Sequence, residues 1–298
     1  MCGGIMIYRH AAIGLVALLS LAGAASAAEC PAGALGTSRT LTLDPAKVSR
    51  VGGGPDYGTP ILEDHEVILT FDDGPTPPWT GKVLDALAAE CVHATFFTVG
   101  TMARAHPALL KRVLADGHTI GTHSEHHAHI PKLPYKAATK EISDGFTTAG
   151  KSLDDQTAVA PFFRFPYLES TRATETYAAA TGIVIWNIDF HASDWTLLTP
   201  EVLANRAIDK IEQKKRGILL LHDIHQRTAL ALPIILQELK KRGYKIVHAV
   251  PVPGAHVNFE VAAKIDPWGA KVAPLRSSRA KASPSFDGGA VEDWPAQH

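Results

Sequence analysis

Two adjacent aspartates, Asp72 and Asp73, follow an apolar run in the segment "VILTFDDGPTP", residues 67–77. Taken alone, Asp-Gly-Pro is also typical of a turn. At the end of a strand that enters a Gly-Pro turn, both carboxylates can nevertheless reach one cleft from different angles. The pair is therefore a candidate catalytic site that requires further ligands from elsewhere in the chain.

A histidine-rich stretch, "THSEHHAHI" at residues 122–130, offers those ligands. His123 and His127 are four residues apart, and on a helical turn this spacing places both imidazoles on one face. His126 and His129 are alternatives, and clustered histidines also bind metals without any function. Two histidines and one aspartate would leave metal positions open for water and substrate, as catalytic sites require.

Two other apolar segments each end near an ionisable side chain. Arg164 lies in "FFRFPYL", where a cation among apolar residues needs an acidic partner, either in the site or in a structural ion pair elsewhere. His222 follows four apolar residues in "LLLHDIH". A histidine at the end of a strand suits proton transfer near neutral pH, although it could also be a buried core residue.

The predicted elements would bring these residues together. Strands are predicted at residues 66–71, 94–99, 117–121, 160–165, 182–188, 217–221 and 244–249, and helices at residues 79–90, 104–116, 135–154, 171–180, 200–214 and 229–242. This alternation predicts a parallel α/β architecture, and about seven units favour a barrel over an open sheet. In such barrels, catalytic groups gather at the carboxyl ends of the strands.

The composition of the 298-residue chain is that of an ordinary globular protein, with 46% hydrophobic and 20% charged residues. A formal net charge of −1 indicates neither nucleic-acid binding nor a polybasic membrane contact. Residues 28–60 are rich in Gly and Pro and are predicted to form an irregular lead-in. Residues 253–298 lack periodicity and are predicted to be a flexible C-terminal extension.

Residues 1–27 have the pattern of an export signal, with an apolar Leu/Ala-rich run that ends in Ala25-Ser26-Ala27, a fit to an A-x-A cleavage site. The alternative is an uncleaved membrane anchor. Cleavage predicts a periplasmic or extracellular protein without stable membrane insertion. Cys30 and Cys91 would remain in a compartment that permits disulfides. They could pair, but we expect a buried, free Cys91.

Five segments resemble, in order, the motifs of the polysaccharide deacetylase family, carbohydrate esterase family 4, with its NodB-like domain. These segments are TFDDGP (70–75), HSEHH (123–127), RFPY (164–167), DFHASDW (189–195) and LLLHD (219–223). The resemblance implies a distorted (β/α)7-type barrel over residues 61–252. It also implies hydrolysis of N-acetyl groups from an N-acetylglucosamine-containing poly- or oligosaccharide, such as peptidoglycan or a chitin-like chain, with release of acetate.

The same resemblance implies a role for each matched position. Asp72 would be the general base, and Arg164 would orient its carboxylate. Asp73, His123 and His127 would bind a divalent metal, most often zinc, with cobalt or another divalent ion as alternatives. The remaining positions would be His222 as general acid, Asp194 or Asp189 as its supporting carboxylate, the Tyr167 backbone N–H at the oxyanion, Trp195 as a pocket wall, and Leu220 against the acetyl methyl group.

Three positions depart from the family pattern and leave the substrate open. Glu125, Ala128 and Leu168 stand where Trp, Pro and Gly are common. An esterase for O-acetylated xylan-type chains and a hydrolase of small cyclic amides are alternatives within this fold. A secreted glycan-binding protein without catalysis is an alternative from another class. The sequence indicates no oligomeric state.

Overall fold

The computed structural model describes residues 1, 3, 30–53 and 62–261. Apart from residues 1 and 3, the predicted export signal lies outside the described residues, as do positions 262–298 of the predicted C-terminal extension. Within the described part, no helix is both long and apolar enough to cross a membrane.

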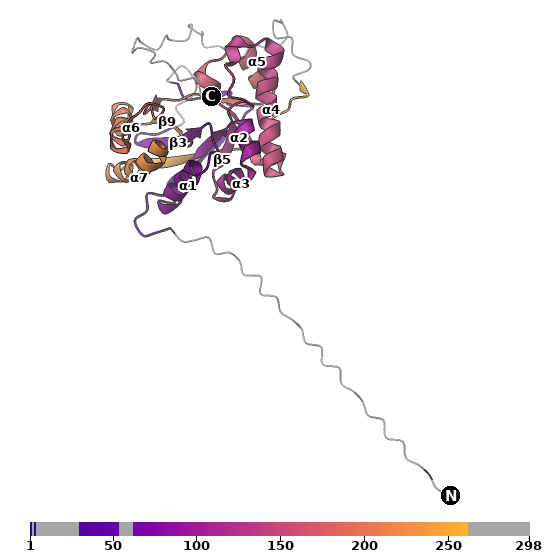
Figure 1. Ribbon diagram of the computed structural model, residues 1–298, viewed down its shortest axis with the longest axis horizontal. Helices are drawn as coiled ribbons and strands as arrows, with labels where there is room; N and C mark the ends of the chain where they lie inside the picture. The colour runs from indigo at the N-terminus through magenta and orange to yellow at the C-terminus, as the bar shows by residue number, and fades with distance from the viewer. Residues whose placement is uncertain (2, 4–29, 54–61, 262–298) are drawn as a thin grey trace.

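A parallel sheet forms the centre of the molecule (Figure 1). Its strands are β1 (Thr37–Leu43), β2 (Arg50–Val51), β3 (Glu66–Asp72), β4 (Thr95–Thr98), β5 (Thr119–Thr122), β6 (Val159–Phe163), β7 (Val184–Trp186), β8 (Phe190–His191), β9 (Gly217–His222) and β10 (Lys245–Pro251). Every residue of β3, β4, β5, β6 and β9 is buried. Continuous apolar runs fit these strands because a parallel sheet is covered on both faces.

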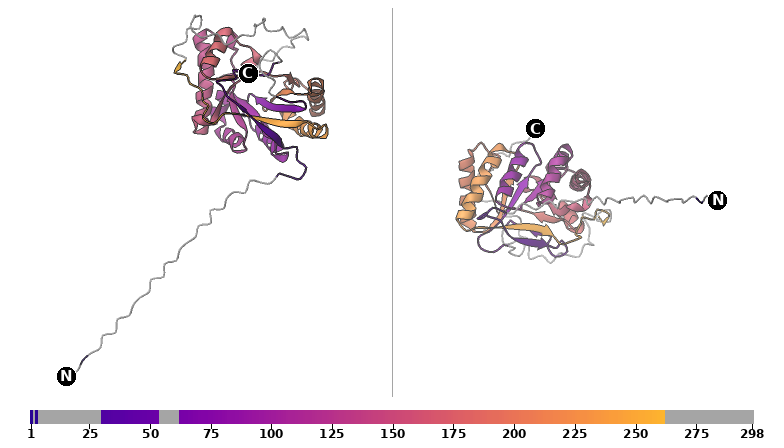
Figure 2. Two further views of the ribbon diagram at one scale, coloured as in Figure 1. Left: turned by 180° about the vertical axis from the view of Figure 1, so that it is seen from behind. Right: turned by 90° about the horizontal axis from the view of Figure 1, so that it is seen from below.

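Helices surround the sheet, with α6 and α7 packed together and α4 on the opposite side (Figures 1 and 2). They are α1 (Trp79–Ala89), α2 (Gly100–Ala105), α3 (Pro107–Ala115), α4 (Tyr135–Leu153), α5 (Arg172–Ala180), α6 (Pro200–Lys214) and α7 (Gln226–Lys241). The start of α6 follows from local chemistry. The Thr199 side chain accepts a hydrogen bond from Val202 N, and Pro200 occupies the first turn.

The sheet has the predicted α/β architecture, and its strands run in the order β1-β10-β3-β4-β5-β6-β7-β2, with β9 beside β3 and β8 beside β9. All pairs are parallel. The hydrogen-bonded order of the strands changes between β7 and β8. β7 pairs with β6, whereas β8, which begins after three intervening residues, pairs with β9. Residues 184–191 therefore connect two distant parts of the sheet, and the barrel is distorted there.

The prediction of an irregular lead-in at residues 28–60 is wrong for two segments. Thr37–Leu43 forms β1, which lies beside β10 (Figure 2), and Arg50–Val51 forms β2 on β7. In β1 exposed and half-buried residues alternate, as in an edge strand with one face toward the protein. The prediction missed this strand because the whole segment was judged by its Gly and Pro content, and the alternation of exposed and half-buried residues in β1 is short. The predicted helix at 104–116 is likewise two helices, α2 and α3, separated at His106.

The prediction of a free, buried Cys91 is also wrong. Cys91 is half-buried and forms a disulfide with Cys30. The lead-in reaches Cys91 because it runs along the end of α1. There, Gly36 N donates to Glu90 O (2.8 Å) and Leu35 N donates to the Glu90 carboxylate (2.7 Å). The disulfide therefore fastens the lead-in to the barrel.

The first part of the predicted flexible extension is ordered against the helices. Phe259 lies 5.8 Å from Phe146 of α4 and 6.3 Å from Tyr177 of α5, measured between ring centroids. Asn258 N donates to Thr181 O at 2.9 Å. Residues 253–261 thus belong to the folded part of the protein. Phe259 packs against two helices, and Asn258 donates a hydrogen bond to the carbonyl group at the end of α5.

Candidate active site

The ionisable residues singled out in the sequence meet at the carboxyl ends of the parallel strands. Asp72 ends β3 and His222 ends β9, and the two are directly paired in register. His123 follows β5, and Arg164 follows β6. Asp72, Arg164 and His222 are buried, as is His123. Neighbouring parallel strands therefore deliver a carboxylate, a guanidinium and two imidazoles to one place.

Asp73, His123 and His127 form a group that could hold a divalent metal ion, because their ligand atoms all lie within 4.8 Å of one another. Asp73 Oδ1 is 3.6 Å from His123 Nε2 and 3.4 Å from His127 Nε2. Asp73 Oδ1 and His127 Nε2 are buried without a hydrogen-bond partner among the described residues. Unsatisfied buried acceptors that converge on one point fit a bound cation.

The tautomer of His123 also suits metal binding. Its Nδ1 lies 2.7 Å from Arg164 O, and a carbonyl can only accept, so Nδ1 carries the proton and Nε2 faces Asp73 with a lone pair. Burial, followed by the nearby His127, lowers the pKa of His123 well below its ordinary value. Burial likewise lowers the pKa of His127. Both imidazoles are therefore neutral near pH 7, the form in which a histidine can bind a metal ion.

The expected helical turn between the two histidines is not present. Residues 123–129 form an irregular loop in which Ser124 and His127 have φ of 67° and 55°. The start of α2 holds this loop, since Gly100 N donates to Ser124 O (3.0 Å) and Thr101 N donates to Glu125 O (2.9 Å). Left-handed backbone positions, rather than helical periodicity, turn both imidazoles toward Asp73.

The alternative ligands His126 and His129 bind other partners. His126 Nδ1 lies 2.8 Å from Glu141, and His129 Nε2 lies 2.7 Å from Glu169. Neither histidine belongs to the group around Asp73. The structure therefore separates the two histidines of the H-x-x-x-H pattern from their neighbours.

Within the described part of the chain, only one carboxylate oxygen of Asp72 accepts a hydrogen bond. Arg164 Nη1 donates to Asp72 Oδ1 at 2.7 Å, whereas Asp72 Oδ2 lies 3.7 Å from His123 Nε2. Burial raises the pKa of Asp72 to about 6, although the Arg164 guanidinium and His222 oppose this rise. One carboxylate oxygen is thus fixed by a cation, while the other faces His123, with which Asp72 lines the same pocket.

Arg164 is completely buried and has several partners besides Asp72. Its Nη1 donates to Thr70 Oγ1 (2.8 Å), and its Nη2 donates to Asn187 O (3.2 Å). The guanidinium carbon lies 4.3 Å from the centre of the Phe97 ring, within cation–π range. The predicted acidic partner in the site is therefore confirmed. Thr70 and Asn187 were not foreseen, because a hydroxyl inside a strand and a main-chain carbonyl leave no sequence signal.

His222 is supported by Asp194 and not by Asp189. Asp194 Oδ1 accepts from His222 Nδ1 (2.8 Å), while Asp189 Oδ2 accepts from Ile218 N (2.9 Å) at the start of β9. Burial would lower the pKa of His222, but the Asp194 carboxylate, with Asp73 and Asp72, raises it to about 10. Burial would raise the pKa of Asp194, but His222 and the Thr228 hydroxyl lower it. The pair is a carboxylate bound to a protonated imidazole.

Apolar side chains close the pocket beside these groups. Leu220, Phe165, Tyr167 and Leu168 line it together with Asp72, His123 and His222. Trp195 stands edge-on to the His222 ring, with 5.7 Å between centroids. The predicted pocket residues Leu220, Tyr167 and Trp195 thus lie at the site. Phe165, inside the RFPY motif, was missed as a lining residue, whereas Leu168 was singled out as a departure from the family pattern and lines the pocket too.

Comparison with known proteins agrees with this geometry. The family model described as polysaccharide deacetylase matches residues 61–186. The chitooligosaccharide deacetylase of Rhizobium leguminosarum is 32% identical over 200 residues, which cover 62% of this chain and 90% of that protein. This chain belongs to the polysaccharide deacetylase family.

Two further members of the family are similar over the same region. The peptidoglycan-N-acetylglucosamine deacetylase of Listeria monocytogenes is 35% identical over 189 residues, which cover 62% of this chain but only 38% of that protein. The solved peptidoglycan deacetylase of Bdellovibrio bacteriovorus superposes with a TM-score of 0.66 at 32% identity, covering 75% of this chain and 62% of that one. The chain thus spans well under half the length of the Listeria deacetylase.

Proposed function

We propose that this protein is a metal-dependent deacetylase that hydrolyses N-acetyl groups on N-acetylglucosamine-containing glycans and releases acetate. The observation that carries the proposal is the position of Asp72. One of its oxygens accepts from Arg164 and the other faces the Asp73, His123 and His127 group, while His222 lies across the same pocket. A base, a metal group and an acid around one pocket suit the hydrolysis of an amide.

Asp73, His123 and His127 would hold the metal, and zinc is our choice because two imidazoles and one carboxylate are a common catalytic zinc set. When bound, the metal would supply Lewis-acid chemistry, since it polarises a carbonyl and lowers the pKa of a water. Cobalt or another divalent ion could serve in its place. Asp72 remains outside the ligand group and keeps its free oxygen for the proton of the attacking water.

The other residues act on the acetyl group and on the leaving nitrogen. His222 donates its proton to the departing amine, and Asp194 keeps the imidazole oriented for this transfer. The Tyr167 backbone N–H would stabilise the oxyanion that develops on the acetyl oxygen. Leu220 and Trp195 would confine the acetyl methyl group. The proposed base and acid thus end two neighbouring strands, β3 and β9, and line the same pocket.

The substrate we propose is peptidoglycan or a chitin-like oligomer, because the relatives are named as deacetylases of these two glycans. The disulfide between Cys30 and Cys91 supports a periplasmic or extracellular location, since such bonds persist in oxidising compartments. This location agrees with a cleaved export signal at residues 1–27. An O-acetyl xylan esterase with the same site chemistry is the competing substrate assignment.

Acetate release tests the proposal directly. Metal-stripped protein is assayed with and without zinc on N-acetylglucosamine oligomers, peptidoglycan and O-acetylated xylan. We expect zinc-dependent acetate from the amino-sugar substrates and a loss of at least roughly 100-fold in Asp72→Asn, as is typical when a general base is removed. Asp64→Asn, which changes an exposed aspartate outside the pocket, is the matched control and should retain full activity.

The pattern of release distinguishes the alternatives. Acetate from xylan alone would move the substrate to esters and overturn the N-deacetylase assignment. Zinc binding without acetate from any substrate would favour a glycan-binding protein or a hydrolase of small cyclic amides. A protein that never binds zinc or cobalt would overturn the proposed metal site.

A further inference from the structure

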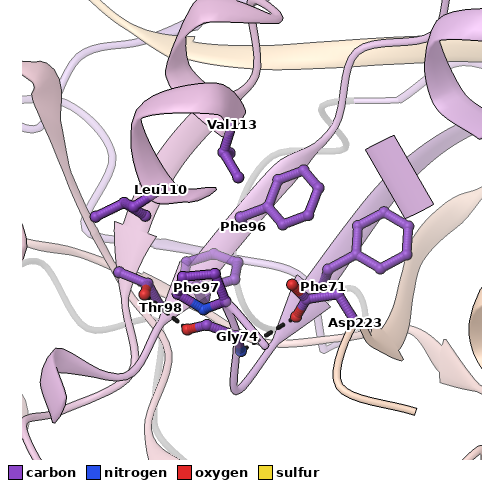
Figure 3. Close-up of a pocket in the computed structure, with 9 residues that line it drawn as sticks. Phe71, Gly74, Phe96, Phe97, Thr98, Leu110, Val113 and Asp223 are labelled. Atoms are coloured by element: carbon purple, nitrogen blue, oxygen red, sulfur yellow. Dashed lines mark hydrogen bonds between the residues drawn. The ribbon is translucent and has the colours of Figure 1, made fainter. Parts of the chain in front are cut away.

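A third carboxylate, Asp223, is buried beside Gly74, the residue that follows the two aspartates of the site (Figure 3). It directly follows His222 and lies beside a small cavity that is otherwise lined mainly by Phe71, Phe96, Phe97, Leu110 and Val113. Among the described residues, no cation lies within ion-pair distance of it. A buried carboxylate without a cationic partner is costly, so its neutral hydrogen-bond donors must matter.

One donor, Gly74, lies in the loop that follows Asp73, and the other, Thr80, lies in the first turn of α1. Asp223 Oδ1 accepts from Gly74 N at 3.1 Å, and Asp223 Oδ2 accepts from the Thr80 hydroxyl at 2.6 Å. On its other side, Gly74 O accepts from the Thr98 hydroxyl at 2.7 Å (Figure 3). Both peptide groups that flank the Gly74 Cα are therefore held by buried side chains.

The hydrogen bond from Gly74 N to Asp223 helps to determine the backbone conformation of Asp73. Asp73 has a left-handed φ of 76°, a backbone conformation that residues with a side chain rarely adopt. The peptide before Asp73 is fixed because Asp73 N donates to Phe97 O at 3.2 Å. The peptide after it is fixed because Gly74 N donates to Asp223. Together these two bonds set φ and ψ of Asp73, and hence the direction of its carboxylate.

The same contact explains the glycine of TFDDGP. A Cβ on Gly74 would lie 2.1 Å from Asp223 Oδ2 and 2.4 Å from Oδ1. Gly74 is not itself in the left-handed region, so backbone freedom is not the reason for a glycine here. The residue lacks a side chain because the Asp223 carboxylate occupies that space.

We propose that Asp223 is a positioning residue that aims the Asp73 carboxylate at the metal group. His222 and Asp223 are consecutive, so the end of β9 supplies the proposed acid to the pocket and the support for a metal ligand behind it. This inference deepens the proposed function and rests on it. Metal affinity is therefore a readout independent of turnover.

The test compares zinc affinities of metal-stripped variants by competition with a chromophoric chelator. Asp223→Ala removes both acceptors and should weaken zinc binding roughly 10–100-fold, the range found for residues that orient metal ligands. Asp223→Asn keeps an oxygen for Gly74 N and should restore affinity to within roughly threefold of wild type, since the oriented bond survives. The absorption spectrum of the cobalt form should change in the alanine variant and return in the asparagine variant.

Glu66→Ala is the matched control for a merely structural effect. Glu66 is also buried, accepts from a backbone N–H, that of Glu63 (2.7 Å), and lies at the opposite end of the same strand as Asp72. The Glu66→Ala substitution should lower the midpoint of urea unfolding and leave the zinc affinity unchanged. Equal zinc affinities for Asp223→Ala and Glu66→Ala would overturn the inference. A wild-type protein that binds no zinc would overturn the proposed function itself, before any variant is compared.

Discussion

Asp194 holds His222 through both of its carboxylate oxygens. Oδ1 accepts from His222 Nδ1 at 2.8 Å, and Oδ2 accepts from the backbone N of the same residue at 2.7 Å. The Thr228 hydroxyl also donates to Oδ2, at 2.7 Å. One buried side chain therefore fixes both the main chain and the ring of the proposed acid, which orients the imidazole more strictly than a single bond would.

Asp194→Asn should reduce kcat on N-acetylglucosamine oligomers by roughly 100- to 10,000-fold, because an amide favours the wrong imidazole tautomer. Asp189→Asn is the control, since Asp189 binds Ile218 N at the start of β9 and does not contact the ring. It should retain wild-type kcat. If the two variants lost activity equally, the assignment of Asp194 as the support for His222 would be wrong.

The disulfide should contribute strongly to stability. Cys30 and Cys91 are 61 residues apart in the chain, and a loop of this length corresponds to about 4 kcal/mol in the chain-entropy account. Cys91→Ser should therefore lower the free energy of unfolding by up to that amount, measured by urea denaturation. Cys30→Ser and the double variant should match it, because each removes the same bond. A reductant should destabilise the wild type and leave all three variants unchanged.

Leu168 should limit the size of the acyl group. It has a left-handed φ of 58° and lines the pocket with Leu220, which we propose to contact the acetyl methyl. Leu168→Gly suits this backbone region and removes a wall of the pocket. The rate on N-propionyl relative to N-acetyl oligomers should rise roughly tenfold, within the usual range for one methylene. Leu197→Gly, at a side chain that is 93% exposed, should leave the ratio unchanged. An unchanged ratio in Leu168→Gly would contradict the prediction.

Much of the barrel was predictable because its strands are continuous apolar runs. Residues 66–71 and 217–221 were expected to be strands and form most of β3 and β9. Short edge strands such as β2 were not predictable, since two residues carry no periodicity and their pairing depends on a distant strand. The disulfide was missed for a similar reason. Its formation depends on the path of the lead-in past α1, which local sequence does not encode.

The site was predictable in its residue types but not in its internal geometry. The order of the motifs brought Asp72, His123 and Arg164 together correctly. It could not choose between Asp189 and Asp194, because the choice depends on which residue of an irregular loop turns toward β9. It also gave no role to Asp223, since this role appears only once the Gly74 N–H is seen to donate to the Asp223 carboxylate.

A histidine cluster at the opposite ends of the strands should make the fold sensitive to acid. The rings of His93 and His248 lie 5.2 Å apart between centroids, and those of His93 and His118 lie 5.8 Å apart. Burial, followed by the neighbouring His93, His248 and Arg112, lowers the pKa of His118 to about 3. Burial and His93 lower the pKa of His248 to about 4. Both side chains are therefore neutral in the folded protein near pH 7.

The sign of the effect follows from these lowered pKa values. Below about pH 6.5 the unfolded chain binds protons that the folded protein does not, so stability is complete above this pH and falls toward pH 4. His248→Gln removes one such group and retains a donor for Thr119 Oγ1, which His248 Nε2 contacts at 2.8 Å. Between pH 7 and 5, the wild type should lose up to about 2 kcal/mol more unfolding free energy than this variant. Urea titrations at both pH values, with the exposed His256→Gln as control, measure the difference. Equal losses in wild type and His248→Gln would show that His248 is not protonated on unfolding in this range.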